Sequence, residues 1–185
     1  MADTLSIITH LGLVLIAAYI LSQRRSPPFW ITQALVVYII YGLAGLVANF
    51  INNNTLNKLY RLAHDVAYVF APAFIAVGVA IGIYFMQEEL AYIFLIVPVL
   101  YVIDYFMDNV DGALMETLTQ ITCLAIAMLS ALKENYEGTI AGVLFLLACI
   151  SDHIHVVSSA QDVSVINGFL IIGCIALWYA FGGSF

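Results

Sequence analysis

The sequence predicts an all-α membrane protein, a seven-transmembrane-helix bundle with short loops. Three observations lead to this prediction. Hydrophobic residues make up 64% of the 185 positions, whereas charged residues make up only 9%. The mean hydropathy is +1.04, and long apolar runs recur along almost the whole chain, separated by short polar breaks. Such a composition is typical of a polytopic membrane protein and excludes an ordinary soluble domain.

Each expected span begins and ends at a polar break. Because a helix rises about 1.5 Å per residue, crossing a bilayer takes ~20 apolar residues. Backbone groups in lipid must be hydrogen-bonded within their own segment, and no alternating strand pattern is present, so we expect helices. Residues 1–185 then form a single polytopic transmembrane domain. The breaks RRSPP, NNNTLNK, MQEE, DNVDG, KENYEG and AQDVS divide it at about 5–22, 29–50, 59–86, 90–107, 113–132, 138–158 and 163–182.

The charge balance restricts the expected partners. Five Lys and Arg stand against twelve Asp and Glu, which gives a formal net charge of −7. This excess of negative charge disfavours nucleic acid and polybasic attachment to anionic lipid. We therefore expect membrane lipid as the surrounding partner, no nucleic acid, and homo- or hetero-oligomers within the membrane as an open alternative.

Consecutive spans alternate in direction, which assigns each polar residue to one side of the membrane. The N-terminus and the loops after the second, fourth and sixth spans share a side. Lys and Arg near span ends favour the cytoplasm, and three against two place this shared side in the extracytoplasmic or lumenal space. All four histidines and eight of the twelve acids fall on it: His10, His64, His153, His155, Asp3, Asp65, Asp104, Asp108, Asp111, Glu116, Asp152 and Asp162.

Several of these ionisable residues lie within apolar spans, where a charge costs about 2.5 to 3.5 kcal/mol on insertion scales. Such residues usually face a bundle interior, a wet cavity or a ligand. Asp152 and His155 are three residues apart and share a helix face. We therefore expect both to face a polar pocket whose apolar floor comes from the third, fourth and sixth spans. The predicted site has catalytic carboxylates and imidazole metal ligands: Asp152, Asp104 and Asp65, with His64, His153 and His155.

Two chemistries are compatible with this set of residues. Imidazole and carboxylate ligands suit zinc and other first-row metals, so a divalent metal such as zinc could activate water. Alternatively the same groups act directly as acid and base. Neither H-E-x-x-H nor H-x-x-x-H occurs in the chain, which leaves both alternatives open. For Asp108 and Asp111, which flank a turn, plain exposure to water is the simpler interpretation.

The cysteines carry a weaker signal. Cys123, Cys149 and Cys174 stand singly within apolar runs, and no C-x-x-C occurs. We expect buried thiols without a metal or redox role.

The segment GVLFLLACISDHIHVV, residues 142–157, resembles the late Ser-Asp-bearing helix of the YhhN/TMEM86 lysoplasmalogenases. These are compact membrane bundles that hydrolyse vinyl-ether lysolipids, and the resemblance implies a lipid hydrolase. It covers about fifteen residues. The family's Gly-Asp on an earlier helix is not reproduced, since Asp104 follows Ile103 and Asp65 follows His64. The family is also expected to have eight spans, against the seven predicted here.

A looser likeness is to the ceramidase and adiponectin-receptor superfamily, seven-helix hydrolases in which three His hold zinc near one membrane face. His153 and His155 give H-x-H in place of the H-x-x-x-H of that superfamily.

The leading hypothesis is therefore a small intramembrane hydrolase that acts on a lipid-like substrate. A proton- or cation-coupled transporter or channel would use the same carboxylates and imidazoles to carry or select an ion. A non-catalytic subunit of a larger membrane complex would bury them against a partner.

Overall fold

The chain is helical throughout the part that the computed structural model describes, residues 4–23, 27–51, 53–107, 111–153 and 159–183. Side chains are described outside residues 152–162. No strand occurs in these ranges. The elements are α1 (Thr4–Ser22), α2 (Phe29–Phe50), α3 (Asn54–Gly82), α4 (Glu88–Ala91), the 3₁₀ turn η1 (Tyr92–Leu95), α5 (Ile96–Phe106), α6 (Gly112–Ala131), α7 (Tyr136–His153) and α8 (Ser159–Ala180).

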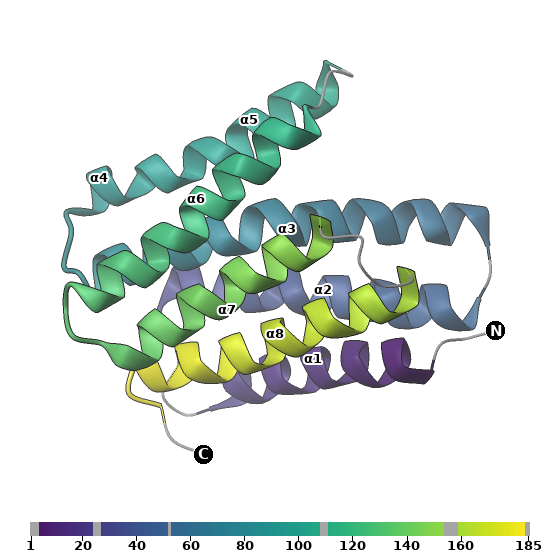
Figure 1. Ribbon diagram of the computed structural model, residues 1–185, viewed down its shortest axis with the longest axis horizontal. Helices are drawn as coiled ribbons and strands as arrows, with labels where there is room; N and C mark the ends of the chain where they lie inside the picture. Colours follow the sequence, from purple (N-terminus) through teal and green to yellow (C-terminus); the bar gives the residue numbers. More distant parts are fainter. Residues whose placement is uncertain (1–3, 24–26, 52, 108–110, 154–158, 184–185) are drawn as a thin grey trace.

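The helices form one bundle with a splayed edge. Figure 1 shows α1, α2, α3 and α8 running close to the long axis, whereas α7 is inclined to it and α4, α5 and α6 cross it obliquely and rise away from the bundle at one end. That end also holds the start of α1, the loop between α2 and α3, the end of α7 and the start of α8.

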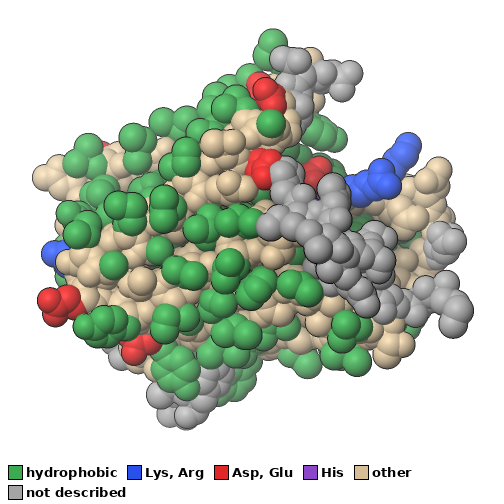
Figure 2. All heavy atoms as spheres, viewed as in Figure 1, with side chains coloured by type: hydrophobic (Ala, Val, Ile, Leu, Met, Phe, Trp, Pro, Cys, Tyr) green, Lys and Arg blue, Asp and Glu red, His purple; other side chains and the backbone are tan. Residues whose placement is uncertain are grey.

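Six helical stretches are long and apolar enough to cross a membrane, as expected of an integral multi-pass membrane protein. The fourth is composite, because α4, η1 and α5 together cover Glu88–Phe106. The remaining apolar helix, α7, is shorter over its described part, Tyr136–Ser151. In Figure 2 hydrophobic side chains extend along the helices on the face shown, and charged side chains appear toward their ends.

The helix boundaries follow local chemistry that hydropathy does not register. The third helix begins at Asn54 and not near residue 59, because the side chain of Asn53 accepts a hydrogen bond of 2.8 Å from the backbone N–H of Thr55. Asp111 caps α6 in the same way, accepting from Leu114 at 3.1 Å. In the fourth stretch, Pro98 of α5 has no N–H and cannot bond to the carbonyl of Phe94. Phe94 lies within the 3₁₀ turn η1.

Small residues set the closest helix contacts. A Cβ on Gly45 would lie 2.2 Å from the imidazole ring of His10, so α2 approaches α1 only because this position is glycine. Between α6 and α7, a Cβ on Gly142 would lie 2.4 Å from the backbone nitrogen of Ala127. In lipid, helices associate by close van der Waals packing, which small residues permit.

Candidate functional site

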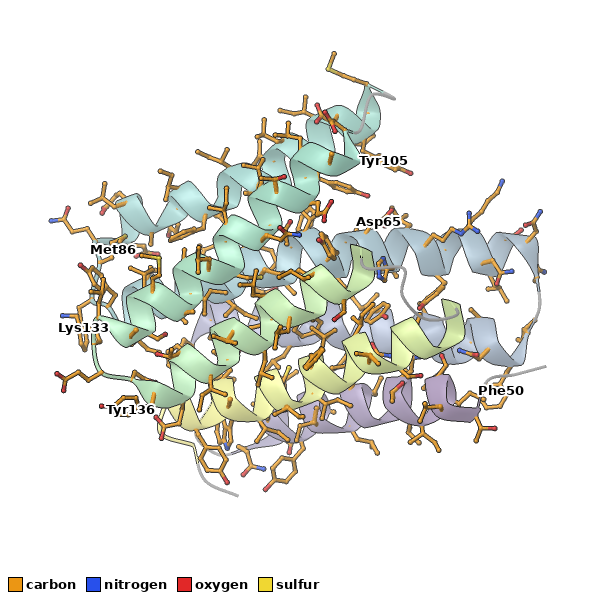
Figure 3. All side chains as sticks on the ribbon, in the orientation of Figure 1. Phe50, Asp65, Met86, Tyr105, Lys133 and Tyr136 are labelled. Carbon is orange, nitrogen blue, oxygen red and sulfur yellow. The ribbon has the colours of Figure 1, made fainter. Side chains whose placement is uncertain are left out.

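The side chains of His64 and Asp65, consecutive residues of α3, lie close together near the acidic end of the bundle. Nδ1 of His64 lies 3.5 Å from Oδ1 of Asp65, and the two side chains are 24% and 55% exposed. Figure 3 shows Asp65 on α3 below the end of α5 that carries Tyr105. The pair therefore combines a half-buried imidazole with a carboxylate open to the surroundings at one membrane face.

Tyrosine rings enclose the imidazole of His64. Its ring centroid lies 5.6 Å from that of Tyr41 on α2 and 6.4 Å from that of Tyr68, one turn further along α3. Tyr60, one turn before His64, stacks on Tyr41 with the centroids 5.9 Å apart. Aromatic neighbours on both sides limit the orientations open to the imidazole ring.

A second histidine lies deeper behind these rings. His10 of α1 is completely buried, and its Nδ1 is 2.8 Å from the carbonyl oxygen of Ser6. A carbonyl only accepts hydrogen bonds, so Nδ1 carries the proton and Nε2 is the acceptor for the hydroxyl of Tyr60, at 3.4 Å. His10 is thus a helix-to-helix hydrogen-bond partner.

A small cavity adjoins His64. Its volume is about 30 Å³, which exceeds the roughly 10 to 15 Å³ that one water needs but leaves no room for a lipid tail. The prediction of an apolar floor from the third, fourth and sixth spans is only partly right, since α2 and α8 contribute and α5 does not. The lining residues are Tyr38, Tyr41, His64, Ala67, Tyr68, Pro72, Phe145, Ala148, Cys149, Ile166 and Leu170.

Asp104 is the remaining predicted site residue whose side chain the structure describes, and it does not join this arrangement. Asp104 of α5 is half-buried, and among the described residues it forms no ion pair or hydrogen bond with His64 or Asp65. Asp152 and His153 fall at the end of α7, but their side chains lie outside the described set. His155 lies outside the described residues altogether.

A metal centre is not assembled by the side chains that the structure describes. Across those residues, no group of three His, Cys, Asp or Glu lies together in a way that could hold a metal ion. Two of the three predicted imidazole ligands, His153 and His155, are outside that search. The zinc alternative therefore stays a prediction that depends on residues 152–158.

Tyr41 and Tyr60 beside His64 were missed by the sequence reasoning, although part of the signal is present. Tyr60, His64 and Tyr68 recur every four residues in LYRLAHDVAY, the spacing that puts side chains on one helical stripe. Tyr41 and His10 come from two other helices, and no local pattern relates them to this stripe.

Comparisons with family models, with curated proteins and with solved structures found no match for this chain. The resemblance to lysoplasmalogenases accordingly stays a prediction.

Proposed function

We propose that this chain is a seven-span intramembrane hydrolase that acts on a lipid-like substrate, with His64 as general base and Asp65 as the carboxylate that orients it. The observation that carries the proposal is the contact of 3.5 Å between Nδ1 of His64 and Oδ1 of Asp65, beside a cavity of about 30 Å³. Imidazole is the side chain most often used to move protons at neutral pH.

The chemistry follows from the tautomer of neutral His64 that the contact with Asp65 favours. When Nδ1–H of His64 donates to Asp65, the lone pair of Nε2 is free to accept a proton from water. A contact of 3.5 Å is long for a hydrogen bond, and catalytic contacts often tighten only when the substrate is bound. The carboxylate also stabilises the imidazolium that forms during proton transfer.

The size of the cavity restricts the way in which a substrate would bind. About 30 Å³ accommodates one or two waters, so in this proposal the cavity holds the attacking water. The apolar tail of the substrate stays in the bilayer beside the helices, and only the bond to be cleaved reaches His64. An ester, amide or vinyl ether near the headgroup lies at the required depth, close to one membrane face.

A second candidate function, proton-coupled transport, draws support from the inner histidine. His10 bonds to Tyr60, Tyr60 stacks on Tyr41, and Tyr41 contacts His64. Two imidazoles and two phenols thus lie close together near Asp65, and ionisable groups within membrane spans often mark proton pathways. Proton flux in liposomes that depends on His10 would favour this function over hydrolysis.

The test of hydrolysis compares the parent chain with Asp65→Asn and His64→Gln in mixed micelles. The substrates are lysophospholipids with sn-1 ester or vinyl-ether bonds and ceramide. Glu137→Gln is the matched control, because it removes one exposed carboxylate at the opposite end of the bundle. Loss of a positioned base should reduce kcat by about 10²- to 10⁴-fold, whereas the control should retain full turnover.

Two outcomes would overturn the proposal: no turnover of any of these substrates by the parent, or equal turnover by the parent and both site variants. A parallel assay with a metal chelator distinguishes metal-activated water from direct base catalysis. Activity that disappears with a chelator and returns with zinc would favour the metal alternative over direct base catalysis.

A further inference from the structure

Two buried thiols face each other across the interface between α6 and α7. Sγ of Cys123 lies 3.7 Å from Sγ of Cys149, and both are free cysteines. The two helices are held close here by Gly142, which has no side chain to separate its helix from the backbone of Ala127. The two sulfurs therefore sit opposite each other on a tightly packed pair of helices.

The two thiols differ in their access to small molecules. Cys149 is 5% exposed and lines the cavity beside His64, and its carbonyl oxygen accepts a hydrogen bond of 3.5 Å from the hydroxyl of Tyr68. Cys123 is 0% exposed and is not part of the cavity lining. A reagent that enters the cavity would therefore meet Cys149 first, with Cys123 directly behind it.

We propose that Cys149 is an attacking thiol and Cys123 a resolving thiol, and that they form a reversible disulfide when hydrogen peroxide enters the cavity. The sequence alone predicted inert buried thiols, and the juxtaposition of the sulfurs is what changes that expectation. The proposal is independent of hydrolysis, and its test uses no measurement of turnover.

The reaction balances in two steps. In the first, the sulfur of Cys149 attacks one oxygen of hydrogen peroxide, the O–O bond breaks, and the hydroxide leaves as water with the thiol proton. This leaves a sulfenic acid on Cys149. In the second, the sulfur of Cys123 attacks that of Cys149, the S–O bond breaks, and the hydroxyl leaves as water with the proton of Cys123. Two electrons pass from the thiols to the peroxide.

The geometry favours the second step more than the first. Thiols in apolar surroundings are mostly protonated and react slowly, so the attack on peroxide should be slow. Once the sulfenic acid exists, the resolving sulfur is already in contact and has to approach from 3.7 Å to about 2.05 Å. Rotation of the two side chains can supply this change, because the helix backbones at Gly142 and Ala127 are already in contact.

Cys174 provides an internal control. It is as buried as the other two, at 1% exposure, and it does not share their sulfur contact within the described structure. Burial alone would make all three cysteines behave alike, whereas the proposed pair leaves Cys174 as a thiol.

The experiment treats the full chain in lipid nanodiscs with hydrogen peroxide and maps the peptides under non-reducing conditions. We expect a disulfide between Cys123 and Cys149 in the parent and in Cys174→Ser, reversed by dithiothreitol. Cys123→Ser should stop at the sulfenic acid on Cys149, trapped by dimedone that is added as the protein is denatured. Cys149→Ser should leave Cys123 at least tenfold less labelled. Cys→Ala versions replace any serine variant that is not monodisperse.

Failure of the parent to form this disulfide would overturn the proposal. Dimedone labelling of Cys123 in Cys149→Ser, equal to that of Cys149 in Cys123→Ser, would overturn the assigned order. A disulfide that includes Cys174 would contradict the pairing itself.

Discussion

The hydroxyl of Tyr60 on α3 lies 3.4 Å from Nε2 of His10 on α1, and this contact joins the first and third helices through a completely buried imidazole. The ring cannot turn to another partner, because Nδ1 is bound to the carbonyl of Ser6 and Gly45 leaves space only for the ring edge. The tautomer of His10 and the direction of the Tyr60 hydrogen bond are therefore determined together.

Replacing Tyr60 by Phe removes this hydrogen bond while keeping the ring that stacks on Tyr41. Interhelical hydrogen bonds in membranes contribute about 0.6 kcal/mol on average, and roughly 1 to 2 kcal/mol in model peptides. We expect a loss of unfolding free energy within that range, measured by SDS titration of the folded protein. Tyr105→Phe is the matched control, because Tyr105 is 50% exposed on the splayed edge. Equal stability of Tyr60→Phe and the control would contradict the assigned bond.

Adding one methyl group at Gly45 should be costly. A Cβ there would lie 2.2 Å from two ring atoms of His10 and force a shift of α1 against α2, so Gly45→Ala should destabilise by about 1 to 3 kcal/mol. At Gly168 of α8 a Cβ meets nothing within 4 Å. Gly168→Ala should be neutral or should stabilise by up to about 1 kcal/mol, because alanine loses less backbone entropy in a helix. Thermal unfolding midpoints of the two variants should therefore shift in opposite directions.

The predicted seven spans would place the two chain termini on opposite sides of the membrane. Two parts of the chain bear most on this prediction. One is the acidic segment between α5 and α6. The other is α7, whose described part is shorter than the other six apolar stretches. Epitope tags at residues 1 and 185 should be accessible from different sides in oriented vesicles. Access to both tags from one side would contradict the seven-span topology and would leave six crossings.

Asp152 stays a predicted catalytic residue, since its side chain is outside the described set. Asp152→Asn keeps the size of the side chain and removes its charge. On the hydrolase hypothesis turnover should fall by about 10²-fold or more while the protein stays monodisperse. If the chain is instead a non-catalytic subunit, the substitution should weaken its assembly into the larger membrane complex. Turnover equal to that of the parent would remove Asp152 from the mechanism.

Much of the architecture was accessible from the chain itself. Apolar runs of sufficient length must become helices in lipid, because no other backbone conformation pairs its own polar groups there. The polar breaks therefore predicted six of the seven helical stretches to within a few residues at each end. The exception, the early start of α3, came from a side-chain cap at Asn53, a local hydrogen bond that hydropathy does not register.

The sequence by itself also predicted that His64 and Asp65 lie near one membrane face, since they fall close to the start of the third expected span. Only the tertiary structure decided which side chains surround them. Tyr41 reaches His64, and His10 reaches Tyr60, through the rotation of α2 and α1 about their axes. Cys123 meets Cys149 through the approach of α6 and α7 at Gly142. Hydropathy is nearly uniform around such apolar helices, so it does not specify their rotation. Steric fit at a few glycines and the pairing of buried polar groups specify the rotation of these helices.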